Sequence, residues 1–161
     1  MKRYIRSAVK DIHDEHERDK QALARDYRTD TRVLMQLAED YDEYVREDLA
    51  RRPNLPIEVQ EKLANDELGC VKSALACNPS ISVDIMKKLA ADEDWRPAMG
   101  LAFNPNTPEY ILRALVNRVP SALARSQYTP LDVLEELKSN EDPEIRQDAW
   151  DTYNRHMRGQ K

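Results

Sequence analysis

Apolar residues return along this chain at a fixed spacing of 26 residues. Leucine followed by alanine marks the repeat most clearly and recurs in four successive copies, at Leu23-Ala24, Leu49-Ala50, Leu75-Ala76 and Leu101-Ala102. The next copy is four residues shorter, yet it regains the register at Leu123-Ala124. A fixed period of this length indicates a chain built from stacked structural repeats.

Two further apolar columns divide each copy into two helices. One column holds Leu37, Leu63, Leu89, Leu115 and Leu137, and the other holds Val33, Val59, Ile85, Ile111 and Val133. Their spacing of about four residues is typical of one face of a helix. We expect first helices near residues 30–39, 56–65, 82–91, 108–117 and 130–139. Second helices are expected near 42–51, 68–77, 94–103, 119–126 and 142–154.

Proline, threonine and aspartate mark the ends of these helices. The residue before Pro105 is disfavoured in the helical region, so Asn104 ends one helix, and the same holds for Asn78 before Pro79. Thr107 and Thr129 each precede a proline and are expected to cap the next first helix. Equivalent N-cap positions of the second helices are occupied by Asp42, Asp94 and Asp142.

The motif Leu101-Ala102-Phe103-Asn104-Pro105-Asn106-Thr107-Pro108 resembles the leucine-rich repeat variant family, and the likeness covers about residues 23 to 150. The resemblance implies a right-handed superhelix without β-sheet, whose shorter helices can be partly 3₁₀. Copies of 26 residues favour α-helix for both. In the family's founding example an N-terminal group of cysteines holds an iron–sulfur cluster, but residues 1–30 here contain no cysteine. We therefore expect no cluster.

The predicted fold is an all-α, right-handed α-solenoid of about five two-helix repeats, with one 22-residue copy. Residues 1–28 are expected to form a long N-terminal capping helix, residues 29–154 the solenoid, and residues 155–161 a flexible tail. Trp150 stands where earlier copies have alanine, so its large side chain is expected to fill the last groove and close the stack.

Composition agrees with an all-α class and bounds the function. Only 3 glycines and 1 phenylalanine accompany 34% charged residues, which favours helices with solvated faces over sheets. The net charge of −5 argues against general attraction to nucleic acid or to anionic membranes. The start of the chain lacks an apolar targeting segment, and Cys70 and Cys77 are too far apart on one helix for a disulfide. These features predict a cytoplasmic protein with no membrane contact.

Catalytic and metal-binding patterns are weak. The segment from His13 to Glu17 places two histidines near carboxylates but offers no obvious third ligand, so an exposed charged helix is the preferred interpretation. Gly69, Gly100 and Gly159 are too far apart for a phosphate loop, and His156 has no serine or cysteine near it in the sequence. We expect no catalytic residue, no metal and no cofactor.

Basic residues recur at equivalent positions of the second helices and suggest a strip for an acidic partner. The candidate partner-binding residues are Arg46, Lys72, Trp95, Arg96, Phe103, Arg118 and Arg125. First helices instead carry Glu58, Glu61, Asp84, Glu109, Asp132, Glu135 and Glu136, which predicts charge segregated between two faces. The alternative is that the basic residues pair internally with acids such as Glu47, Asp48 and Glu144, and that Trp95 and Phe103 belong to the core.

The expected function is a non-enzymatic protein-interaction module, because an extended stack offers a long surface per residue. The alternative is a nucleic-acid-binding helical-repeat protein that follows phosphates with the basic strip. The oligomeric state and the identity of the partner stay open at this level.

Overall fold

The computed structural model describes residues 20–159, and over that range the chain is all-α, with no strand. Residues 20–25 are helical. The first helices of the successive copies are α2 (Thr31–Leu37), α4 (Ile57–Leu63), α6 (Val83–Ala90), α8 (Glu109–Ala114) and α10 (Leu131–Leu137). The second helices are α3 (Glu43–Ala50), α5 (Gly69–Ala76), α7 (Trp95–Ala102), α9 (Pro120–Arg125) and α11 (Pro143–Gly159).

The observed helices lie where the 26-residue pattern predicts them, and both helices of each copy are α-helices. Most ends fall one to three residues inside the predicted bounds, which is the usual uncertainty at helix termini. Two predicted bounds are wrong. The helix expected to reach residue 28 ends at residue 25. Helix α11 continues through residues 155–159, which were expected to be a flexible tail. The rest of the predicted capping helix, residues 1–19, lies outside the described residues, as do His13 and His16.

Aspartates cap the second helices as predicted. The carboxylates of Asp42 and Asp94 accept hydrogen bonds from backbone amides two residues on, and Asp142 does the same for the amide of Glu144. The threonine prediction is wrong. The hydroxyls of Thr107 and Thr129 donate instead to main-chain carbonyls six residues earlier, and the prolines after them are the N-caps. Each threonine thus ties a first helix to the preceding second helix.

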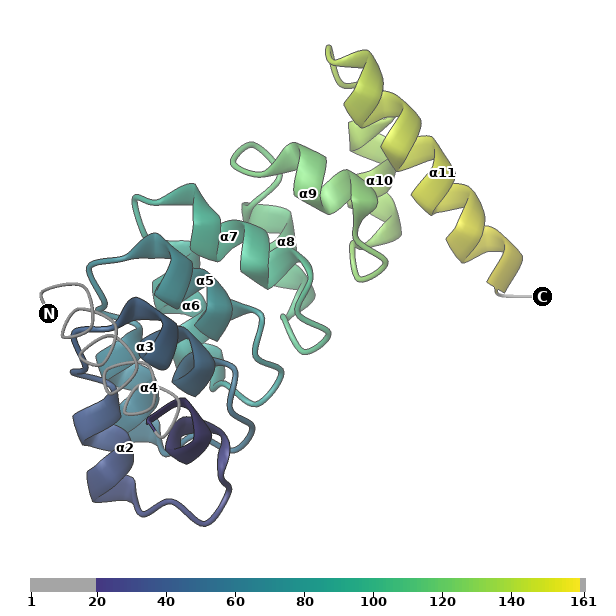
Figure 1. Ribbon diagram of the computed structural model, residues 1–161. Helices are drawn as coiled ribbons and strands as arrows, with labels where there is room; N and C mark the ends of the chain where they lie inside the picture. The colour runs from purple at the N-terminus through teal and green to yellow at the C-terminus, as the bar shows by residue number, and fades with distance from the viewer. Residues whose placement is uncertain (1–19, 160–161) are drawn as a thin grey trace, which may run out of the picture.

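The predicted columns form the core. Every alanine of the Leu-Ala pairs from Ala24 to Ala124 is fully buried, and the leucines before them are fully buried from Leu49 onward. Leu23, in the first copy, is 44% exposed. Second helices pack in chain order, α3 on α5, α5 on α7, α7 on α9 and α9 on α11, while α2 packs on α4 and α6 on α8. Figure 1 shows the resulting stack, with α2 near one end and α11 at the other.

Helices α5 and α7 approach each other closely at Gly100. A Cβ atom added at Gly100 would lie 2.7 Å from the carbonyl oxygen of Ser73 and 2.8 Å from the Cβ of Ala76. Glycine at this position therefore lets the two helix backbones come together, which a larger residue would prevent.

Asparagine side chains connect consecutive copies. The Asn104 amide donates to the carbonyl oxygens of Ala76 and Asn78 at 2.7 and 2.8 Å, and the Asn78 amide donates in the same way to the carbonyls of Ala50 and Arg52. Both asparagines are buried. These bonds satisfy carbonyl groups that the end of each second helix leaves without an intrahelical partner.

Arg52 interrupts this series of asparagines. Its Nη1 group donates to the carbonyls of Ala24 and Asp26, but its buried Nε has no hydrogen-bond partner among the described residues. Arginine also lacks the side-chain oxygen with which Asn78 accepts the backbone amide of Ser80. The turn after Arg52 differs accordingly, because Asn54 has a positive φ of 55°, unlike every other non-glycine residue of the described range.

Trp150 ends the stack. It occupies the alanine column but is 47% exposed, so its side chain is not buried in a groove as the sequence predicted. The ammonium group of Lys138 lies 4.1 Å from the centre of its ring and 3.9 Å from that of Tyr153. Two cation–π contacts therefore shield the aromatic side chains at this end.

Candidate functional site

Arg46 and Lys72, the first two residues of the predicted basic strip, are held in ion pairs between copies. Arg46 Nε lies 2.6 Å from an Asp66 carboxylate oxygen, and Lys72 Nζ lies 2.6 Å from a carboxylate oxygen of Asp92. The side chains of both cations are only 13% exposed. Lys20 and Asp40 form the preceding pair at 2.9 Å, with the same separation of 20 residues. We call these three pairs the ion-pair ladder.

Burial and ion pairing change the pKa of two residues in the ion-pair ladder, Arg46 and Asp92. The hydrogen bond with Asp66 raises the pKa of Arg46, although burial opposes it. Burial acts to raise the pKa of Asp92, but the hydrogen bonds from Lys72 and from the backbone amide of Asp94 outweigh it and hold the pKa below its usual value. Arg46 and Asp92 are thus fully charged near neutral pH.

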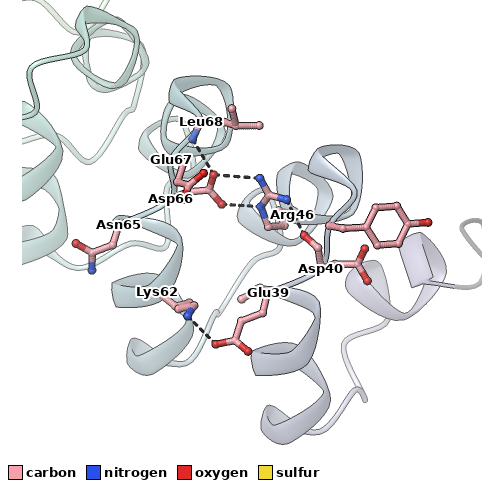
Figure 2. Close-up of a pocket in the computed structure, with 10 residues that line it drawn as sticks. Glu39, Asp40, Arg46, Lys62, Asn65, Asp66, Glu67 and Leu68 are labelled. Atoms are coloured by element: carbon pink, nitrogen blue, oxygen red, sulfur yellow. Dashed lines mark hydrogen bonds and ion pairs between the residues drawn. The ribbon is translucent and has the colours of Figure 1, made fainter.

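A hollow of about 630 Å³ lies beside this ladder. Figure 2 shows Arg46 spanning it, with its guanidinium bonded both to the Asp66 carboxylate and to the main-chain carbonyl of Asp40. Lys62 points across to Glu39, 2.6 Å away. The two cations that line this hollow, Arg46 and Lys62, are therefore already engaged by carboxylates of the chain, which disfavours an incoming anion.

Arg118 also turns inward. Its Nη1 and Nη2 groups donate to the main-chain carbonyls of Ala90 and Asp94, at 2.6 and 3.1 Å. Of the five residues of the predicted strip, Arg96 and Arg125 are exposed, whereas Arg46, Lys72 and Arg118 are held in contacts between copies. Their charge stabilises the junctions between copies. The acids proposed for internal pairing, Glu47, Asp48 and Glu144, are not their partners.

The other four predicted residues remain on the surface of the second helices. Trp95 is 55% and Phe103 43% exposed, so neither belongs to the core. Arg96 and Arg125 are exposed as well. Trp95 and Phe103 lie at opposite ends of α7, and Arg125 lies at the end of α9, in the repeat position that Phe103 occupies on α7.

A second hollow, of about 330 Å³, opens between Trp95 and the preceding copies. Its floor is α5, which contributes only the small side chains Cys70, Ser73, Ala74 and Cys77. One wall is α7, with Trp95, Arg96 and Met99, and the other is α3, with Glu47 and Arg51. We call this hollow the second-helix groove. Small residues on the central helix and large ones on its two neighbours create the depression.

Exposed arginines of this face lie over covered carboxylates. Arg51 pairs with Glu47 at 2.7 Å, and Arg96 pairs with Asp94 at 2.8 Å. The two arginine side chains are 56% and 48% exposed, whereas those of Glu47 and Asp94 are 17% and 19% exposed. The guanidinium edges therefore meet the solvent, and the carboxylates mainly fix their position.

The two cysteines in the groove are not activated. Burial raises the pKa of both thiols, and the carboxylate of Glu47 raises that of Cys70 further. A thiol with a raised pKa is a poor nucleophile at neutral pH. The cysteines therefore contribute shape and apolar surface to the groove.

Within residues 20–159, no group of three or more histidine, cysteine, aspartate or glutamate side chains is placed to hold a metal ion. In the same range, none of the helices has the length and apolar character required to cross a membrane. His156, expected to lie in the tail, contacts the main-chain carbonyl of Gln127 at 2.8 Å and helps to fix α11.

The candidate residues chosen from the sequence did not include Arg51 or Met99. Arg51 occupies the same repeat position as Cys77, Phe103 and Arg125, so this column already marks one edge of the face. Met99 has no such signal, because the equivalent residues of other copies are polar.

No protein-family model, curated protein sequence or solved structure matches this chain. The resemblance to the leucine-rich repeat variant family therefore stays a prediction that depends on the motif alone.

Proposed function

We propose that this chain is a non-enzymatic helical-repeat module that binds a protein partner across its second-helix face. The observation that carries the proposal is the second-helix groove itself, where an exposed tryptophan, a methionine and two half-exposed arginines surround an uncharged floor. Tryptophan, methionine and arginine are enriched in protein–protein interfaces, and hot spots form where such residues flank a hollow.

The proposed architecture is a right-handed solenoid of about five two-helix repeats, similar to the leucine-rich repeat variant family. The 26-residue spacing of the asparagine bonds and of the ion-pair ladder supports it, since each contact links a copy to the next one only. Such a stack presents equivalent residues of successive copies in rows. The second-helix groove is lined by residues of three consecutive second helices, α3, α5 and α7.

A capture experiment tests the proposed function. The protein is immobilised and exposed to lysate of its source, in parallel with the variant Trp95→Ala/Met99→Ala and with Tyr110→Ala as a matched control. Tyr110 is 54% exposed but belongs to α8, a first helix. We expect a protein to be retained by the parent and by the control but lost with the groove variant, whose circular dichroism stays unchanged.

Nuclease treatment separates the nucleic-acid alternative. The net charge of −5 disfavours general binding to a polyanion, so we expect capture to survive nuclease and the protein to bind generic DNA weakly. Capture that disappears with nuclease, together with a linear fall of log affinity for DNA with log salt, would instead identify a nucleic-acid-binding protein.

A further inference from the structure

We infer that the occupant of the second-helix groove is an acidic peptide segment of the partner, which inserts an apolar side chain into the hollow and places carboxylates against Arg51 and Arg96. This inference rests on the proposed function and specifies the chemistry of the partner. It follows from the charge, shape and hydrogen-bonding capacity of the groove.

The most exposed charged groups at the groove are the guanidinium groups of Arg51 and Arg96, because the carboxylates paired with them are less exposed. Arg51 stands on the α3 wall and Arg96 on the α7 wall, so a segment lying along α5 has a guanidinium group on each side. On α9, Arg125 repeats the arrangement, with a side chain 54% exposed above Asp148, which is 30% exposed. Complementarity with this surface requires a partner whose own exposed charge is negative.

Both groove arginines keep donors for a second carboxylate. A guanidinium has five N–H groups. Arg51 uses Nη2 for Glu47, and its Nη1 lies 3.9 Å from Asp48, beyond hydrogen-bond length. Arg96 uses Nε and Nη2 for Asp94, and within the described range its Nη1 makes no hydrogen bond. Arg46 differs, because all three of its nitrogens donate within the ladder.

The shape of the hollow limits what can enter. Its volume of about 330 Å³ is at the lower end of the range for binding pockets, enough for one or two side chains. The floor carries no charge, and Met99 and Trp95 offer an apolar wall that adapts to an aliphatic or aromatic group. A narrow hollow with cations on both sides therefore fits an apolar residue flanked by acidic ones.

A displayed library of random 12-residue peptides tests the inference directly. The full chain is used as the selection target, and each selected pool is then bound to three variants. They are Arg51→Gln/Arg96→Gln, Trp95→Ala, and Arg113→Gln as a control for an arginine that is 44% exposed on a first helix. Circular dichroism verifies that each variant is folded.

We expect the selected pool to carry a net negative charge and a recurrent apolar residue. Replacing both groove arginines should weaken binding of the best peptides about tenfold or more, since each charge-assisted hydrogen bond contributes on that order. The Arg113→Gln variant should bind as the parent does. With Trp150 changed to Phe, the fluorescence of Trp95 should shift on saturation with the same peptides.

The outcomes that overturn the inference differ from those that overturn the proposed function. A neutral or basic pool that is lost with Trp95→Ala shows that the groove binds peptides of other chemistry, so the inference fails and the proposed function stands. A selected pool that Trp95→Ala leaves unaffected, or no enrichment at all, contradicts both.

Discussion

At the scale of single residues, one repeat position just after the second helix, occupied by Arg52, Asn78, Asn104 and Ser126, joins consecutive copies. Asn78 and Asn104 use both ends of the amide, donating to two carbonyls of the preceding copy and accepting the amide two residues on. Ser126 makes one hydrogen bond of each kind. Its hydroxyl donates to the carbonyl of Ala102 and accepts the backbone amide of Tyr128. Arg52 keeps the donation but leaves a buried nitrogen unsatisfied within the described part of the chain.

Replacing Arg52 with asparagine should therefore stabilise the protein. The variant removes a buried cation with an unpaired Nε and can form the turn of the later copies, which would relieve the positive φ of Asn54. We expect the free energy of unfolding to rise by about 1–2 kcal/mol, measured by urea denaturation.

The matched control for this variant is Asn104→Ala, which leaves two buried carbonyls without a donor and should lower the free energy of unfolding by about 2–4 kcal/mol. A lower midpoint for Arg52→Asn would mean that the arginine makes a contribution beyond its two carbonyl bonds.

At the scale of elements, backbone approach fixes how α5 and α7 pack. A Cβ added at Gly100 would lie 2.7 Å from the carbonyl oxygen of Ser73, so the two helices meet here with no room for a side chain on α7. Helix α5 packs against both α3 and α7, and its small side chains line the second-helix groove. The same packing that stabilises the core thus shapes the candidate site.

The variant Gly100→Ala tests this packing, because the close approach predicts a decrease in the free energy of unfolding where helix propensity alone predicts an increase. Alanine normally stabilises a helix interior by about 1 kcal/mol relative to glycine. Here the new Cβ would lie 2.7 Å from a backbone oxygen, so we expect the free energy of unfolding to fall by about 1–3 kcal/mol. Gly159→Ala is the control, because nothing lies within 4 Å of its added Cβ. A Gly100→Ala variant with a higher melting temperature would contradict the close approach.

At the scale of the whole molecule, basic residues divide between two roles. Those on the turn side of the stack, in the ion-pair ladder, join one copy to the next. Those at the open face of the second helices remain half-exposed. All seven acids expected on the first helices are exposed, but Lys62, Lys87, Lys88 and Arg113 are exposed on the same helices, so acidic and basic side chains are mixed on this side.

From the ion-pair ladder we expect the free energy of unfolding to fall at acidic pH. The pKa of Asp92 is lowered in the folded chain from an ordinary value of 3.8, so its contribution is present above that value and is lost as pH falls through the folded pKa. Pairing with Arg96 and Arg113 lowers the pKa of Asp94 and Asp132 in the same sense.

Unfolding in urea at a series of pH values measures this effect. We expect Lys72→Met to destabilise the protein most above about pH 5, and the difference from the parent to shrink between about pH 4 and pH 2. Arg113→Met should show a smaller effect, because its pair with Asp132 is largely solvent-exposed. If the difference in free energy of unfolding between Lys72→Met and the parent does not change with pH, the ion pair between Lys72 and Asp92 does not cause the loss of stability in acid.

The sequence by itself determined the number, kind and order of helices between residues 30 and 154, because a period of 26 residues and a helical apolar spacing leave few other ways to bury the leucine and alanine columns. It also determined the aspartate caps, which depend only on neighbouring residues. It placed Trp95, Arg96, Phe103 and Arg125 among the candidates, since repeat positions show which side chains face outward.

Only the tertiary structure decided which cations are available to a partner. In the sequence, Arg46, Lys72 and Arg118 look as available to a partner as Arg96 does. Their own partners lie 20 or more residues away in the chain, and such separations carry no local signal. The asparagine bonds and the depth of the groove have the same origin, because both depend on how closely consecutive second helices approach. Helical spacing predicts which residues share a face, whereas the contact between two faces depends on the packing of the whole stack.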